Sequence, residues 1–357
     1  MRAVAALTVL FTHVERMRQP MGMAGLIDFA FNSFIGGLAV TFFFVLSGFL
    51  ITALLLAEKS RLGTIRLKRF LVNRALRIWP LYYLSLVAGY AISIFLLRET
   101  GSDPLRNGLL MNLVLLPNFA FALGLLPDIL IQLWSVGTEE QFYFAWPFLI
   151  RRFSEAKLTR LFIAVIFIWL AARGMVRVVG GKDSWLNVLL FRTRIDCMAV
   201  GGLAALLLYF RERSEGWWSD LHLWLLQRRA GWIAAGVFIF LLWVSYRYDV
   251  SLYQLYAGLS AILILRVIHI PRGAAWLESG LMRYLGKISY GIYLLQHFII
   301  FLLFEGWLKN ANELFPGLPA GSRLAGILVF LVTALLTVGL ASVSYRFYEL
   351  RFLKRKY

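Results

Sequence analysis

An arginine and a histidine near the amino terminus have the spacing of a paired binding and catalytic site. Arg2 and His13 are eleven residues apart in a largely apolar segment. Eleven residues make about three helical turns, so both side chains would share a face, with Arg2 at the inner surface and His13 about 16 Å deeper. A neutral imidazole can accept a proton at physiological pH, so His13 is a candidate general base. A histidine that is hydrogen-bonded to a neighbouring helix fits the same spacing equally well.

Two adjacent carboxylates, Glu139 and Glu140, lie near the middle of another apolar segment. An ionisable side chain at the centre of a membrane span costs about 2.5–3.5 kcal/mol to insert, so such residues usually face a cavity or a partner. Adjacent helical residues point about 100° apart, so one carboxylate could face a cavity while the other pairs with an arginine. We favour a functional role for at least one of them over a purely structural ion pair.

Two further polar positions in apolar segments each allow two interpretations. Ser47 and Gly48 follow a run of apolar residues, and glycine in a spanning helix admits either a partner helix or a thin ligand. Helix packing is the favoured interpretation of this segment taken alone. His297, within another apolar segment, suits a packing or hydrogen-bonding role as well as a catalytic one.

An arginine-rich segment after the second apolar run is a candidate phosphate site. Arg66, Arg69, Asn73 and Arg77 recur at helical spacing, and Arg74 lies three residues before Arg77. Guanidinium groups bind phosphate oxygens through paired hydrogen bonds, which would suit a phosphorylated ligand. A basic helix that lies on anionic lipid has the same composition, and composition alone favours that alternative.

The elements that would position these residues are membrane-spanning helices. Hydrophobic residues make up 60% of the 357-residue chain and charged residues 16%, whereas soluble domains average about 45–50% and about 25%. A span needs about 20 mostly apolar residues, which predicts an all-α, polytopic membrane bundle of about ten helices. The predicted spans cover residues 1–18, 34–56, 78–97, 130–150, 161–178, 193–210, 230–247, 252–269, 288–306 and 324–345.

The stretch between the third and fourth spans is apolar but interrupted. Pro117 and Asn118 break residues 109–126, which predicts a re-entrant or interfacial segment on the outer side. The first apolar run is predicted to be a span rather than a cleavable signal peptide, because no small-residue cleavage site follows it. The chain has no evident linker, low-complexity tract or internal repeat, so residues 1–357 are predicted to form one integral-membrane domain.

Basic residues are concentrated in alternate loops. Lys and Arg number 37 against 19 Asp and Glu, a net charge of +18, and 24 of the 37 lie in five loops. These loops are 57–77, 151–160, 211–229, 266–287 and 346–357. The positive-inside rule then predicts both termini in the cytoplasm and a multi-pass protein of the bacterial inner (plasma) membrane. The excess charge is assigned to topology and anionic lipid, not to nucleic acid.

Several cofactor chemistries lack a sequence signal. Cys197 is the only cysteine, which excludes an internal disulfide and thiol clusters for metal. The four histidines are too scattered to indicate a metal site, and no metal is expected. The sequence also contains no P-loop, dinucleotide glycine fingerprint, H-E-x-x-H motif or G-x-S-x-G nucleophile elbow.

Six segments, in this order, resemble the acyltransferase-3 family of membrane-bound O-acyltransferases. The family patterns are R-x10-H at Arg2 and His13, F-F-x-L-S-G-F at 43–49, R-x-x-R at Arg74 and Arg77, W-S-L-x-x-E-E-Q-F-Y at 134–143, L-G-x-I-S-Y-x-x-Y-L-x-x-H at 285–297, and S-Y-R-F-x-E at 344–349. The resemblance covers nearly the whole chain. It implies transfer of an acyl group, often acetyl, from cytoplasmic acyl-CoA to a hydroxyl of a carbohydrate or related acceptor, often outside the cytoplasm.

The implied reaction gives roles to the candidate residues. His13 would act as general base on the acceptor hydroxyl, which attacks the thioester either directly or through an acyl-histidine intermediate. Glu139 or Glu140 would orient His13 or stabilise its charged form, and Ser47 would donate a hydrogen bond near the thioester. The acyl-CoA donor, most simply acetyl-CoA, would be bound by Arg2, Arg69, Arg74 and Arg77.

The remaining expected partners are a carbohydrate or glycolipid acceptor and the lipid bilayer. Arg192, Arg194 and Asp196, at the outer end of the sixth span, could contact the acceptor, but a local salt bridge fits them equally well. A transporter or flippase of a lipid-linked saccharide, without acyl transfer, is the main alternative function. Transporters often contain inverted repeats, and the sequence shows no such symmetry, so the enzyme is favoured.

Overall fold

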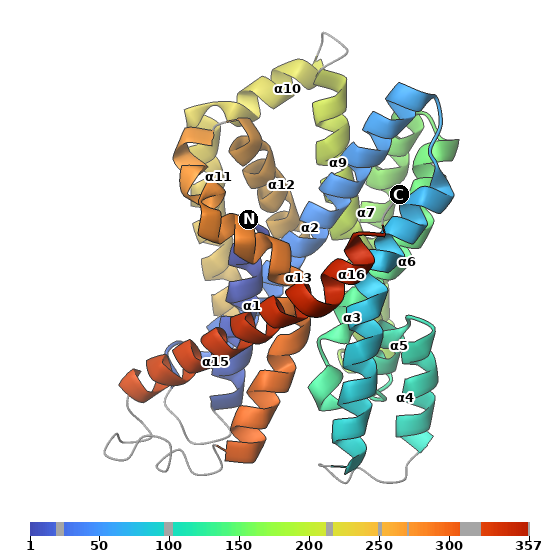
Figure 1. Ribbon diagram of the computed structural model, residues 1–357. Helices are drawn as coiled ribbons and strands as arrows, with labels where there is room; N and C mark the ends of the chain where they lie inside the picture. The colour runs from blue at the N-terminus through green and yellow to red at the C-terminus, as the bar shows by residue number, and fades with distance from the viewer. Residues whose placement is uncertain are drawn as a thin grey trace.

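Each of the ten predicted spans overlaps a helix of the computed structural model (Figure 1), and residues 96–97 of the third span lie outside the described residues. The structure describes residues 1–18, 25–95, 103–211, 217–248, 252–269, 271–307 and 323–355, and these residues contain no strand. The predicted all-α class is confirmed for this part of the chain. The ten helices are α1 (Arg2–Arg18), α2 (Phe29–Leu62), α3 (Leu67–Phe95), α6 (Leu133–Arg152), α7 (Glu155–Gly180), α9 (Ile195–Arg211), α11 (Arg228–Tyr248), α12 (Tyr253–His269), α13 (Gly280–Phe301) and α15 (Arg323–Ser344).

Shorter helical elements connect the long ones. The short α-helices are α4 (Asp103–Leu113), α5 (Pro117–Ala122), α8 (Trp185–Arg192), α10 (Trp217–Leu226) and α16 (Leu350–Leu353). Two segments are 3-10 helical, η2 (Asp128–Leu130) and η3 (Pro271–Glu278), and two are π-helical, η4 (Leu302–Trp307) and η6 (Tyr345–Glu349).

Seven helical segments of the described chain are long and apolar enough to cross a membrane. They contain α2, α3, α7, α8 with α9, α11, α13 and α15. Helices α1 and α12 have 17 residues each, fewer than the about 20 that a span needs. Helix α6 is lowered in hydropathy by two glutamates and two arginines. The chain is therefore a multi-pass membrane protein, and three of the ten predicted spans do not qualify by length and hydropathy.

Helix α2 is the central element of the bundle and crosses α9 at very close range. A Cβ atom on Gly48 would come within 2.0 Å of the Met198 carbonyl oxygen, and one on Gly201 within 2.0 Å of the Val45 carbonyl oxygen. The absent side chains let the two backbones touch. Gly48 therefore serves helix packing, as favoured from the sequence.

The arginine-rich segment is helical, in keeping with its helical spacing, and only residues 63–66 of the predicted connection 57–77 lie outside a helix. Helix α2 ends at Leu62, and Gly63 takes the left-handed conformation with φ 71° while its N–H donates to the Lys59 carbonyl at 2.9 Å. Helix α3 begins at Leu67, so most of the basic residues lie in its first three turns. Their charge lowers local hydropathy, but Leu, Lys and Arg are good helix formers.

The segment 109–126 is broken as predicted. Helix α4 ends at Leu113, and α5 begins with Pro117, which suits a first helical turn because it needs no N–H donor there. The Pro117 ring packs against Gly137 of α6, where an added Cβ would lie 2.5 Å from the ring. Both short helices lie at the lower end of the bundle in Figure 1.

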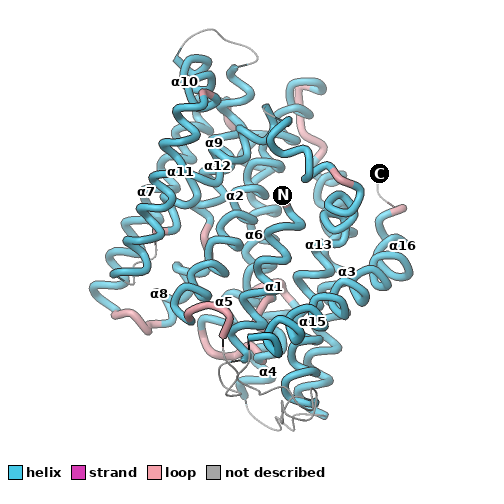
Figure 2. The backbone as a smooth tube through the Cα atoms, turned by 90° about the vertical axis from the view of Figure 1, so that its left-hand side faces the viewer, coloured by secondary structure: helices cyan, strands magenta, loops and turns pink. Residues whose placement is uncertain are grey.

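The connections between long helices gather at two opposite ends. The α2–α3 and α6–α7 connections and α10 lie at the upper end in Figure 1, and the start of α15 lies toward the lower end. In the turned view of Figure 2, α1, α2 and α6 lie between α7 and α11 on one side and α3 and α16 on the other. A site between α1, α2 and α6 is therefore inside the bundle.

Candidate active site

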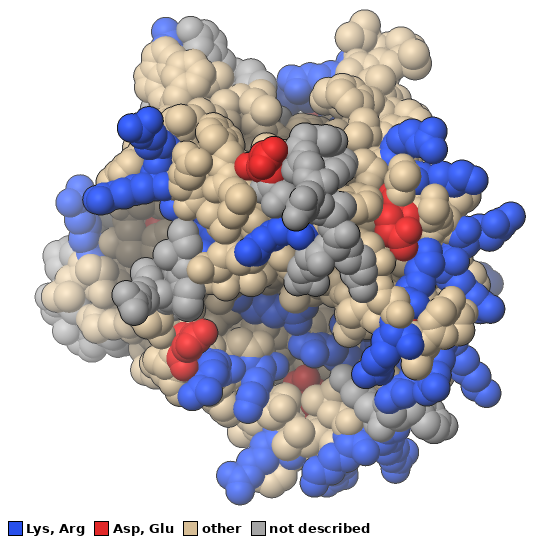
Figure 3. Space-filling model, turned by 90° about the horizontal axis from the view of Figure 1, so that it is seen from above, with Lys and Arg blue, Asp and Glu red and all other residues tan. Residues whose placement is uncertain are grey.

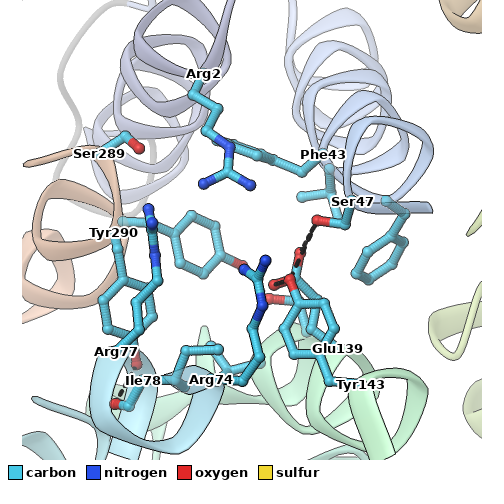
Figure 4. Close-up of a pocket in the computed structure, with 15 residues that line it drawn as sticks. Arg2, Phe43, Ser47, Arg74, Arg77, Ile78, Glu139, Tyr143, Ser289 and Tyr290 are labelled. Carbon is cyan, nitrogen blue, oxygen red and sulfur yellow. Dashed lines mark hydrogen bonds between the residues drawn. The ribbon is translucent and has the colours of Figure 1, made fainter. Parts of the chain in front are cut away.

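Five helices surround a pocket inside the bundle (Figure 4). Helices α1, α2, α3, α6 and α13 each contribute side chains to it. The lining residues are Arg2, Val40, Phe43, Phe44, Ser47, Arg74, Arg77, Ile78, Ser135, Val136, Glu139, Tyr143, Ser289, Tyr290 and Tyr293. The α6 members 135, 136, 139 and 143 recur at helical spacing, so one face of that helix points into the pocket.

The sequence predicted that Arg2 would lie at the inner surface, and the structure places it inside the bundle. Helix α1 starts near mid-height and runs toward the lower end in Figure 1. Arg2 shares the pocket with Ser47, which lies near the middle of the 34-residue helix α2. Ser47, Arg74, Arg77 and Glu139, from three other helices, converge on the same pocket.

Both oxygens of the Glu139 carboxylate accept hydrogen bonds from the pocket wall. Ser47 Oγ donates to Oε1 at 2.9 Å, and the Tyr143 hydroxyl donates to Oε2 at 2.9 Å. Tyr143 follows Glu139 by one helical turn, and Ser47 comes from the facing helix α2. Figure 4 shows this carboxylate pointing into the pocket beside Ser47. Two donors therefore fix its orientation.

Three guanidinium groups face this single carboxylate among the described lining residues. They belong to Arg2, Arg74 and Arg77 (Figure 4). The Arg74 guanidinium also lies 5.4 Å from the Phe70 ring centroid and 5.5 Å from that of Tyr143. The pocket is thus net positive, and planar guanidinium groups are suited to phosphate and carboxylate oxygens. Arg69 is exposed and is not part of the lining.

Glu140 points away from Glu139 and has a different partner. Its Oε2 accepts a hydrogen bond from the Trp79 indole N–H at 2.7 Å, and its Oε1 is buried without a partner among the described residues. The sequence anticipated that one carboxylate would face a cavity and that the other would pair with an arginine. Glu139 does face the cavity, but Glu140 bonds to a tryptophan.

His13 and His297 form a separate pair of rings. Their centroids are 4.4 Å apart with the planes at 66°, an edge-to-face arrangement. Neither ring is among the described residues that line the pocket, because His13 lies three helical turns beyond Arg2. His297 and Gln296 interact with the His13 ring, whereas Glu139 and Glu140 bond to Ser47, Tyr143 and Trp79.

Tyr293 lies between the pocket and the histidine pair. It lines the pocket, and it precedes His297 on α13 by one helical turn. Its hydroxyl is 2.6 Å from Ser135 Oγ. Sequence reasoning missed Tyr143, Tyr290 and Tyr293 as pocket residues, although all three lie in the segments that carry the family resemblance. Buried tyrosines are common in packed helices, so their residue type alone carried no signal.

The three candidates Arg192, Arg194 and Asp196, at the predicted outer end of the sixth span, have different surroundings. Arg194 is buried, donates to the Gly37 carbonyl at 2.8 Å and lies 3.5 Å over the Tyr253 ring. Asp196 pairs with Arg173, so a local salt bridge explains it.

Arg192 lies against two aromatic rings. Its guanidinium lies 4.9 Å from the Phe121 ring centroid and 5.3 Å from that of Trp134. Among the described residues it has no carboxylate partner. No group of three or more His, Cys, Asp or Glu side chains that could hold a metal occurs in the described ranges.

The chain is similar to a family of acyltransferase domains and to curated O-acetyltransferases. The model of an acyltransferase domain family matches residues 1–346. A peptidoglycan O-acetyltransferase of Listeria monocytogenes is 28% identical over 331 residues, which cover 85% of this chain and 49% of that protein. A Staphylococcus aureus protein, provisionally named an O-acetyltransferase, is 26% identical over 398 residues, covering 96% of this chain and 59% of that protein. The chain thus spans about half of these relatives' length. No solved structure matches it.

Proposed function

Since the chain belongs to the acyltransferase domain family, we propose that it is a membrane O-acyltransferase that moves an acyl group from acyl-CoA to a hydroxyl of a cell-envelope carbohydrate or glycoconjugate. The acyl group is acetyl in the simplest case, in keeping with the names of the relatives. The observation that carries the proposal is the net positive pocket inside an apolar helical bundle. The family match favours acyl transfer over the transport of a lipid-linked saccharide.

The donor binds through the arginines. CoA carries several phosphate groups, and guanidinium groups bind phosphate through charge-assisted hydrogen bonds. Arg74 and Arg77 lie within the first three turns of α3, and this helix begins toward the upper end of the bundle (Figure 1). Seen from above, this end displays many Lys and Arg side chains, and basic residues also lie in a hollow near its centre (Figure 3). The positive-inside rule assigns this end to the cytoplasm, where acyl-CoA is found.

Glu139, Ser47 and Tyr143 shape the pocket. Ser47 has one hydroxyl hydrogen and donates it to Glu139, so in this arrangement it is not available to the thioester. We therefore assign Ser47 and Tyr143 to holding the Glu139 carboxylate. This carboxylate shares the pocket with Arg74 and offsets part of its positive charge.

His13 accepts the acceptor's proton. The hydroxyl oxygen then forms a bond to the acyl carbon, the carbon–sulfur bond breaks, and the CoA sulfur leaves with that electron pair. The imidazolium returns the proton to the sulfur, so free CoA thiol is released. We assign Arg192 to contact with the acceptor or with the developing negative charge. A general base of this kind contributes about 10²–10⁴-fold to the rate.

The test is release of free thiol from acetyl-CoA by purified protein, with and without a panel of cell-envelope glycans. Release by the wild type is expected to require one glycan, and His13→Ala is expected to reduce it by about 10²–10⁴-fold. His222→Gln, which alters a histidine outside the site, is the matched control and should retain release. Equal rates for His13→Ala and wild type would remove His13 from the reaction. Absence of release by folded wild type with every glycan would count against acyl-CoA as the donor.

A further inference from the structure

Gln296 is buried, and only the NH₂ end of its side-chain amide has a hydrogen-bond partner among the described residues. Its side chain is 0% exposed, and its Nε2 donates to the Tyr293 carbonyl oxygen at 3.0 Å. A carbonyl oxygen can accept but not donate, so the amide must turn its NH₂ group toward Tyr293 and its Oε1 the other way. That Oε1 is buried and has no hydrogen-bond partner among the described residues.

The His13 ring presents the complementary group. Gln296 interacts with the His13 side chain, and His13 Nδ1 is also buried without a partner in the described part of the chain. A buried polar group that makes no hydrogen bond costs about 1–3 kcal/mol. A hydrogen bond between them, with Nδ1–H as donor and Oε1 as acceptor, would satisfy both buried atoms, and catalytic hydrogen bonds are often loose before substrate binds.

This contact selects one form of the imidazole. A neutral histidine carries its hydrogen on one ring nitrogen and a lone pair on the other. An amide oxygen facing Nδ1 favours the hydrogen there, which leaves the lone pair on Nε2. The edge-to-face contact with His297 at 4.4 Å then restricts rotation of the ring.

We propose that Gln296 is the positioning residue of His13, holding the imidazole in the form whose Nε2 accepts the acceptor's proton. This inference rests on the proposed function and replaces the expected role of Glu139 or Glu140, which bond elsewhere. Unlike a carboxylate, the amide orients the ring without adding negative charge. The charged and titratable groups that act on His13 are Arg16 from α1 itself, His297 from α13 and Arg192 from α8.

Two substitutions test the role. Gln296→Leu removes the acceptor oxygen at similar volume, and kcat is expected to fall about 10- to 100-fold while the KM for acyl-CoA is unchanged. Gln296→Glu keeps an oxygen in place and adds a negative charge that stabilises protonated His13. Activity should therefore survive, and the pH at which it rises should move up by about one unit or more.

Gln132 supplies the matched control. It is also a buried glutamine whose Nε2 donates to a carbonyl of α13, that of Leu294 at 2.9 Å, and whose Oε1 lacks a partner among the described residues. Gln132→Leu should lower stability as much as Gln296→Leu does, but it should leave the pH dependence of activity unchanged. An unchanged kcat for Gln296→Leu, or an unchanged pH profile for Gln296→Glu, would overturn the proposal.

A second measurement does not depend on activity. Nitrogen NMR of ring-labelled histidines, with His13 assigned by its loss in His13→Ala, reports which nitrogen carries the hydrogen. We expect protonated Nδ1 in the wild type and a shift toward protonated Nε2 in Gln296→Leu. If the wild type has a protonated Nδ1 but releases no thiol, the proposed function would be wrong while the positioning role of Gln296 would stand. Protonated Nε2 in the wild type would sink the positioning role alone.

Discussion

At the scale of single residues, the three pocket arginines lead to a quantitative prediction for donor binding. Arg77→Ala removes one guanidinium from the pocket lining. A hydrogen bond to a charged group contributes about 1.5–3 kcal/mol, so the Kd for CoA should rise about 10- to 100-fold. Isothermal titration of purified protein with CoA measures the change.

Lys68→Ala is the matched control for that titration. Lys68 lies on the same helix but is exposed, outside the described pocket lining. Its variant should bind CoA as the wild type does. Unchanged affinity in Arg77→Ala would remove this arginine from the donor site. An equal loss in both variants would indicate general electrostatic attraction instead of a site.

Residue type alone selected five of the residues that line the pocket, but it did not show how they pair. Polar side chains in apolar helices are costly, which directed attention to Ser47 and Glu139. Their hydrogen bond joins positions 92 residues apart, and hydropathy carries no information about such pairs. Gln296 was missed for a different reason. An uncharged amide in a span gives a weaker signal than the histidine beside it.

At the scale of helices, the contact of α10 with α9 and α12 depends on two neutral imidazoles. Arg211 Nη1 lies 3.2 Å from His222 Nε2 and 2.6 Å from His269 Nε2. A guanidinium can only donate, so both nitrogens accept and both rings are neutral. Burial, together with His269 and Arg211 beside it, lowers the pKa of His222 to about 4.

Acid should therefore loosen α10. In an unfolded chain His222 would titrate near its usual pKa of about 6.5, so between about pH 4 and pH 6.5 the folded protein binds fewer protons than the unfolded one. The stability that the folded protein gains from neutral His222 is complete above pH 6.5 and is lost as the pH falls from about 6.5 to about 4. Hydrogen exchange of α10 amides, corrected for intrinsic rates, should be faster at pH 5 than at pH 7.5. His222→Gln should remove most of that difference, and an undiminished difference would contradict the assignment.

Apolar runs predicted the long helices well, because hydropathy and length are properties of local sequence. The same measure failed at the start of α3, where the first three turns are basic yet helical. Hydropathy also did not predict α8 and α10, which have 8 and 10 residues. Such short helices depend on tertiary packing for their stability, so their existence is decided by neighbours distant in sequence.

At the scale of the whole molecule, the proposed reaction requires access from two sides. The arginine pocket lies toward the end where α2 joins α3, and His13 lies further along α1 toward the opposite end. Tyr293 and His297, one turn apart on α13, connect the two. A cytoplasmic donor and an acceptor on the outer side can then meet inside one bundle. The donor can enter from the cytoplasm and the acceptor from the outer side only if the basic end of the bundle faces the cytoplasm.

That orientation can be measured on α7, which is long and apolar enough to span. Lys157 and Lys182 are exposed near its two ends, and the only native cysteine, Cys197, is buried and gives little background. In right-side-out vesicles, an impermeant maleimide should label Lys182→Cys and spare Lys157→Cys, because the basic 151–160 connection stays inside. Inside-out vesicles should reverse the pattern. The opposite result would turn the arginine pocket outward, away from cytoplasmic acyl-CoA, and would overturn the assignment of the donor site even if His13 proved essential.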